Sequence, residues 1–153
     1  MMTYQEIRDL CSAVLSPEPE TLDRPTMEDW EFLEGRLEMV FAPEFKYFID
    51  LMSEFSFPGE VYNVARCGRT NGNDTVLTVY ESELANVDWP CDLIQFYGIG
   101  NGDYFALDRR EGAQSAVYYR YHEDGHIEKY NPSFESWLRN LSQFLAGEET
   151  AEK

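Results

Sequence analysis

The sequence is poor in positive charge, and this shortage limits the partners that the protein can bind. Its 153 residues include 12 Lys and Arg against 29 Asp and Glu, for a formal net charge of -17 at pH 7. Proteins that bind nucleic acid rely on cationic contacts with phosphate groups, and anionic lipid attracts basic segments in the same way. The charge therefore argues against direct binding of DNA, RNA or a membrane surface, and it favours a basic protein as the partner.

Cysteine is also scarce, with three residues at wide and irregular spacing: Cys11, Cys67 and Cys91. No two of them form a CxxC pair, so the sequence shows neither a zinc-ribbon nor a redox motif. We expect reduced thiols, some of them buried, and no metal or cofactor. The N-terminal residues lack the basic start and apolar stretch of a secretory signal, and no apolar run reaches the roughly 18 residues of a membrane-spanning helix. These absences predict a cytoplasmic protein.

Hydrophobic residues nevertheless make up 43% of the chain and aromatic residues 15%, enough for the core of one domain over residues 1–153. In the N-terminal third, apolar residues recur at the spacing of a helical face in three segments, which begin near Tyr4, Thr26 and Pro43. The first is a helical extension within residues 1–20, which ends at Ser16-Pro17 because proline cannot continue a helix. The second has Asp29 in a capping position and an apolar face that reaches Val40.

The period then changes to that of short strands. Runs rich in β-branched and aromatic residues predict strands at Val76–Tyr80, Leu93–Tyr97, Tyr104–Asp108, Ala116–Tyr121 and Ile127–Tyr130. Asp124-Gly125 predicts a two-residue hairpin loop, and a last apolar stripe predicts a helix from Ser133 to Gly147, followed by a frayed tail over residues 148–153. The order of elements predicts an α+β fold, in which an antiparallel sheet of about five strands packs with N-terminal and C-terminal helices.

Three groups of residues invite an enzymatic interpretation, and each has a simpler one. Gly98-x-Gly100-x-Gly102 precedes a strand and not a helix, so it predicts a glycine-rich hairpin and not a phosphate loop. His122 and His126 flank the predicted hairpin loop, where His126 would lie opposite Glu123, and we expect surface residues and not a metal site. Asp103 and Asp108 end one strand, but neither has an obvious histidine companion for hydrolysis. The sequence therefore predicts a protein that is not an enzyme.

The distribution of charge is more informative. Residues 70–107 contain no Lys or Arg, and residues 18–34 hold seven acids against Arg24 alone. If these acids share a face, their field would steer a cationic protein, with aromatic neighbours as anchors. We expect the protein-binding set to be Glu81, Glu83, Asp88, Trp89, Asp92 and Asp103. The alternative is an evenly solvated acidic surface that reflects the source organism, with the aromatic residues in the core.

Part of the chain resembles a known family. The run from Trp89 to Asp108, with Leu93-Ile94-Gln95-Phe96 and Gly102-Asp103 inside it, resembles the W…L-I-x-F…G-x-G-D-x-F-x-L-D core of the SUKH superfamily, the Smi1/Knr4-like domains. The helix start Ser133-Phe134-Glu135-Ser136-Trp137-Leu138 is similar to the family's closing helix. Upstream, Pro43-Glu44-Phe45-Lys46-Tyr47-Phe48 looks like another helix start of the family. The resemblance covers residues 76–145 and 26–58.

The resemblance implies an α+β fold without catalytic activity, and it provides no catalytic residues to transfer. Many bacterial members look like immunity proteins that neutralise a cognate toxin, often a nuclease or deaminase, whereas fungal members are regulatory scaffolds. We therefore expect an immunity protein that blocks a basic, nucleic-acid-targeting toxin sterically and electrostatically. The alternative is a non-enzymatic regulatory or scaffold protein that binds host proteins.

Overall fold

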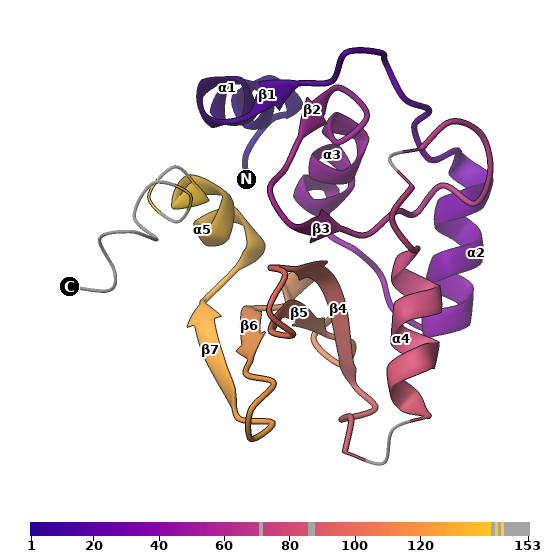
Figure 1. Ribbon diagram of the computed structural model, residues 1–153, viewed down its shortest axis with the longest axis vertical. Coiled ribbons are helices and arrows are strands. Elements are labelled where there is room, and N and C mark those ends of the chain that lie inside the picture. The colour runs from indigo at the N-terminus through magenta and orange to yellow at the C-terminus, as the bar shows by residue number, and fades with distance from the viewer. Residues whose placement is uncertain (71, 86–87, 142, 144, 146–153) are drawn as a thin grey trace.

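The computed structural model describes residues 1–70, 72–85, 88–141, 143 and 145. Its helices are α1 (Tyr4–Val14), α2 (Met27–Leu37), α3 (Pro43–Leu51), α4 (Val76–Leu84) and α5 (Phe134–Arg139), with a short 3-10 helix η1 (Gly112–Gln114). The strands are β1 (Ser16–Pro17), β2 (Phe55–Ser56), β3 (Glu60–Val61), β4 (Leu93–Gly98), β5 (Tyr104–Asp108), β6 (Val117–Arg120) and β7 (Ile127–Asn131). Strands β3 to β7 form one antiparallel sheet in chain order, and β1 pairs with β2 (Figure 1). The predicted α+β fold is confirmed.

Helix α2 begins where the sequence predicts and ends earlier. The Thr26 hydroxyl accepts a hydrogen bond from the Asp29 amide at 3.1 Å, and the Asp29 carboxylate accepts one from the Thr26 amide at 2.9 Å. This reciprocal pair satisfies two amides that the first turn leaves open. The helix ends at Leu37 because Glu38 adopts a left-handed conformation with φ 53°. Val40 lies beyond that end and is 62% exposed, so the prediction that the apolar face reaches it is wrong.

The prediction of a strand at Val76–Tyr80 is also wrong, since this segment is the start of helix α4. The Thr75 hydroxyl caps the helix by accepting a hydrogen bond from the Thr78 amide at 3.1 Å. Val76, Val79 and Tyr80 are buried at helical spacing against the sheet. Burial on one face outweighs the weak strand preference of β-branched residues. The remaining strand of the sheet is instead β3, which pairs with the end of β4.

The hairpins β4–β5 and β6–β7 occur in the predicted order, but the loop of the second one is longer than predicted. Between β4 and β5 the predicted glycine-rich hairpin is confirmed, with Gly100 and Gly102 at positive φ. Beyond the ends of β6 and β7 the Tyr121 amide donates to the His126 carbonyl at 2.8 Å, so the loop that this bond closes has four residues and not two. The Gly125 amide donates to the Tyr121 carbonyl at 3.0 Å and closes this wider turn. His126 therefore lies opposite Tyr121, and its predicted place opposite Glu123 is wrong.

The main core lies between the sheet and helices α3 and α5. Trp137 of α5 is 1% exposed, and its ring packs against those of Phe48, Phe96 and Phe105 at centroid distances of 5.3 to 5.6 Å. Ser133 caps α5 as predicted. The predicted helix end at Gly147 and the tail over residues 148–153 fall outside the described residues. Helix α4 lies alongside β4 (Figure 1), and its buried residues Val76, Val79 and Tyr80 belong to the same core.

Candidate protein-binding surface

The structure places the six predicted contact residues in two parts of the fold. Glu81 and Glu83 lie on α4, Asp88, Trp89 and Asp92 lie between α4 and β4, and Asp103 directly precedes β5. Glu81 and Asp88 are exposed, and Glu83 and Asp92 are half-buried. Trp89 and Asp103 are each only 6% exposed. Five of the residues thus gather around the α4–β4 connection, and their accessibility to a partner differs widely.

Arginines from outside the acid-only stretch neutralise part of it. Arg36 of α2 forms an ion pair with Glu81 at 2.6 Å. Asp92 pairs with Arg109 at 2.7 Å and with Arg110 at 3.3 Å, just beyond β5. Cations from elsewhere in the chain also neutralise part of the acidic stretch at residues 18–34, because Arg69 pairs with Glu20 and Lys46 pairs with Glu34. The negative field near these carboxylates is therefore weaker than the sequence alone indicates.

Trp89 fastens the α4–β4 connection to the sheet. Its indole N–H donates to the Leu93 carbonyl at 3.0 Å, and its ring meets the Tyr104 ring edge-on at 5.6 Å. The guanidinium of Arg120 lies over the same ring, 4.7 Å from its centre. The Tyr104 hydroxyl also donates to the Glu83 carboxylate at 3.2 Å. Trp89 and Tyr104 thus help to position the carboxylates around the α4–β4 connection, and Tyr104 does so for Glu83 directly.

Asp103 fastens two hairpins together, and the prediction that it lacks a histidine companion is wrong. Its carboxylate accepts hydrogen bonds from the His122 amide at 2.8 Å and the Tyr119 hydroxyl at 2.7 Å, and it lies 2.8 Å from Nδ1 of His122. Burial favours a higher pKa for Asp103, but these hydrogen bonds outweigh it and hold the pKa below its usual value. An added Cβ at Gly102 would lie 3.0 Å from the His122 ring, so glycine permits this approach.

Asp108, the other member of the predicted carboxylate pair, is held by arginine. Its carboxylate accepts a hydrogen bond from Arg110 at 2.9 Å, which lowers the pKa of Asp108 although burial opposes the change. The Asp108 backbone amide donates a hydrogen bond to the Ser115 hydroxyl at 2.8 Å. Both carboxylates therefore remain ionised at neutral pH and serve as hydrogen-bond acceptors for nearby backbone and side chains.

Sequence reasoning missed a cluster of tyrosines on the β6–β7 hairpin, which we call the tyrosine face: Tyr119, Tyr121 and Tyr130. The ring of Tyr119 lies 4.7 Å from that of Tyr121 and 6.0 Å from that of Tyr130. Tyr121 is 37% exposed and Tyr130 46% exposed. The alternation of Tyr119 and Tyr121 with Arg120 along one strand is the signal that could have revealed a shared face.

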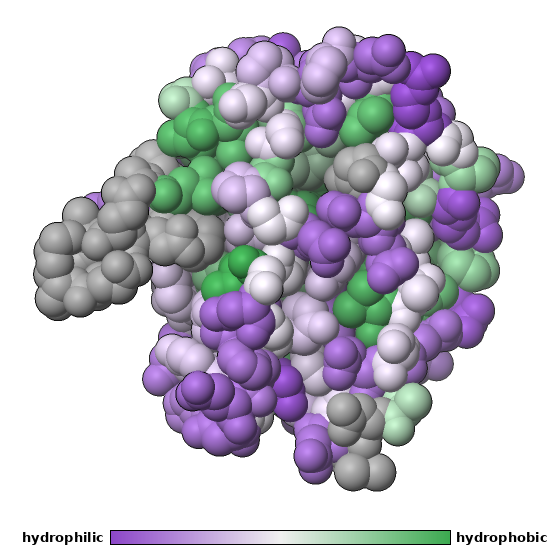
Figure 2. All heavy atoms as spheres, in the orientation of Figure 1, coloured by the Kyte–Doolittle hydropathy of each residue, from purple (hydrophilic) through white to green (hydrophobic). Residues whose placement is uncertain are grey.

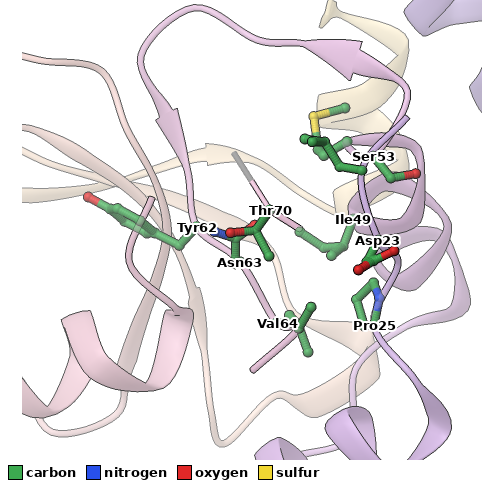
Figure 3. A pocket seen from close by; sticks show the side chains of 11 residues that line it. Asp23, Pro25, Ile49, Ser53, Tyr62, Asn63, Val64 and Thr70 are labelled. Carbon is green, nitrogen blue, oxygen red and sulfur yellow. The ribbon is translucent and has the colours of Figure 1, made fainter. Parts of the chain in front are cut away.

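The hollows of the molecule are small or shallow. The pocket in Figure 3 lies between Asp23, Ile49, Tyr62 and Asn63, and the space open to water in it is about 10 Å³, which suits a single water molecule. A wider hollow of about 240 Å³ between α2 and α4 is lined by Phe32, Arg66 and Leu77, among others. Within the described part of the chain, no group of three metal-ligating side chains converges, and no helix has the length and apolarity to cross a membrane.

Comparison with known families identifies the family of the chain. The family model SUKH_5, described as SMI1-KNR4 cell-wall, matches residues 4–143 and so includes α1, the sheet and α5. No curated protein matches the chain.

Proposed function

The chain belongs to the SUKH (SMI1-KNR4) family, and we propose that it is an immunity protein that binds and neutralises a cognate bacterial toxin. Family membership carries the proposal, because it is consistent with proteins of the immunity type. The net charge of -17 supports a basic target, such as a toxin domain with a cationic cleft for nucleic acid. The protein would act in the cytoplasm by occupying that cleft, without catalysing a reaction.

We assign the contact to the carboxylates around the α4–β4 connection. Glu81 and Asp88 are exposed and are the leading candidates, with the half-buried Glu83 and Asp92 beside them. Trp89 and Asp103 contribute in a different way, because each is buried and holds a loop in place. Carboxylates on a fixed support lose little conformational entropy on binding, so they suit a charge-complementary interface.

The test is binding to the product of the adjacent toxin gene, measured by calorimetry from 50 to 500 mM salt. We expect tight binding that weakens as salt rises, since salt screens exposed charges. The double variant Glu81→Gln, Asp88→Asn should bind about tenfold more weakly at low salt, if each exposed pair is worth about 0.2–1 kcal/mol. Because Glu81 also pairs with Arg36, a urea melt of the variant should accompany the measurement.

The matched control removes the same charge from another part of the surface. Glu28 and Glu31 of α2 are exposed and form no ion pair within the described residues. The variant Glu28→Gln, Glu31→Gln should therefore keep nearly the affinity of the unchanged protein. Equal losses in both variants would refute the assigned contact. Absence of binding to the toxin, with binding to host proteins instead, would refute the immunity role and favour a scaffold.

A further inference from the structure

The tyrosine face is a rigid aromatic surface that remains open to solvent. The ring of Phe105 lies beneath it and meets Tyr119 at 5.0 Å and Tyr130 at 4.9 Å, both edge-on. Phe105 is fully buried, and it connects the face to Trp137 in the core. Edge-on and offset ring contacts restrict how far each ring can turn. The two exposed tyrosines, Tyr121 and Tyr130, thus stand in fixed positions before any partner binds.

Among the described residues, the carboxylates that border the face pair with histidine and not with lysine or arginine: Asp103 lies 2.8 Å from His122, and Glu128 lies 3.1 Å from His126. The Tyr119 hydroxyl donates to Asp103 at 2.7 Å, and the Tyr121 hydroxyl donates to Glu128 at 3.1 Å. Successive strand residues alternate between faces, so Arg120 and Lys129 project to the opposite side, where Arg120 covers Trp89. Hydrophilic side chains cover the hairpin tip at the lower left of Figure 2. Electron-rich rings beside the exposed Glu128 carboxylate form a surface complementary to cations.

We propose that the tyrosine face binds arginine side chains of the basic partner and anchors the interface. This inference rests on the proposed function. A guanidinium stacks on a tyrosine ring and still reaches a carboxylate at its edge. Tyrosine is enriched among the residues that dominate binding energy. A second copy of this chain is a poor occupant, because two molecules of charge -17 repel each other. Strand β7 is the last in the sheet order, so a partner can approach the face from the side.

The direct test uses a synthetic arginine–serine repeat peptide as the probe, at 50 mM salt. We expect the ring signals of Tyr121 and Tyr130 to shift in NMR spectra when the peptide is added, and those of Tyr47 on α3 to stay unchanged. The variant Tyr121→Leu, Tyr130→Leu should bind the peptide about five to twenty times more weakly, because two exposed cation–π contacts are lost. The variant Tyr121→Phe, Tyr130→Phe keeps the rings and should lose less than about twofold.

Tyr118→Leu, on the opposite face of β6, is the matched control and should bind the peptide like the unchanged protein. Peptide shifts confined to the α4–β4 carboxylates, or equal affinity in the Leu and Phe variants, would overturn the proposal. Dimerisation that the Leu variant abolishes would identify a second copy as the occupant and also overturn it. Full toxin affinity in the Leu variant would overturn the anchor and leave the immunity role standing. Peptide binding at the tyrosines without toxin binding would refute the immunity role alone.

Discussion

Gln95 is the least expected residue of the core, and its replacement gives a quantitative test of the structure. It lies in the middle of β4, pairs across to Ala106 of β5 and is completely buried. Neither the amide nitrogen nor the amide oxygen of its side chain has a hydrogen-bond partner among the residues that the structure describes. An amide buried without a partner costs about 1–3 kcal/mol in proteins, so Gln95→Met, which keeps nearly the same volume, should stabilise the fold by about that amount.

The measurement is urea unfolding at 25 °C, supported by thermal melts. For a chain of this size each kcal/mol corresponds to about 2–4 °C in the melting temperature. Gln114→Met is the control, because Gln114 is exposed and its replacement should change stability by less than about 0.5 kcal/mol. If both Gln95→Met and Gln95→Leu destabilise the protein by about 1 kcal/mol or more, the Gln95 amide makes hydrogen bonds in solution, and the reasoning fails.

Two further predictions concern single residues. Asp103→Asn should lower the free energy of unfolding by about 1–3 kcal/mol at pH 7. Because the folded-state pKa of Asp103 is lowered, the stability that its carboxylate contributes is present above the unfolded pKa of about 3.9 and is lost as pH falls through the folded value. Urea melts at pH 7 and pH 3 should show the difference between the variant and the unchanged protein shrinking in acid, and a constant difference would contradict the assignment. Gly68→Ala should destabilise the fold by about 1–3 kcal/mol, because Gly68 has φ 94° and an added Cβ would clash with the Asp23 carboxylate. An added Cβ at Gly35 inside α2 meets nothing within 4 Å, so Gly35→Ala should stabilise the fold by about 0.5–1 kcal/mol. Similar changes in melting temperature for the two variants in one series of thermal melts would contradict this prediction.

Local signals in the sequence predicted the starts of α2 and α5 correctly, but they predicted a strand where α4 begins. Thr26 and Ser133 could be identified as caps because the hydrogen bonds they accept come from within three residues. The segment from Val76 to Tyr80 reads as a strand because its composition is β-branched and aromatic, but its conformation depends on burial against β4, some 17 residues later in the chain. The four-residue loop of the β6–β7 hairpin likewise follows from a register that the hairpin signal Asp124-Gly125 does not determine.

Ion pairs between residues far apart in the sequence also limit what the charge pattern can predict. A run without Lys or Arg predicts a negative surface only if no cation folds onto it, and Arg36 reaches Glu81 from 45 residues away. Similarly, His122 reaches Asp103 from 19 residues away, which no spacing rule reveals. The field that a distant toxin feels is the sum over all charges, so neutralising two of the 29 acids, either Glu28 and Glu31 or Glu81 and Asp88, changes it equally and only slightly. Only a direct contact distinguishes the two pairs, so the dissociation rate, and not the association rate, decides whether the α4–β4 carboxylates touch the partner.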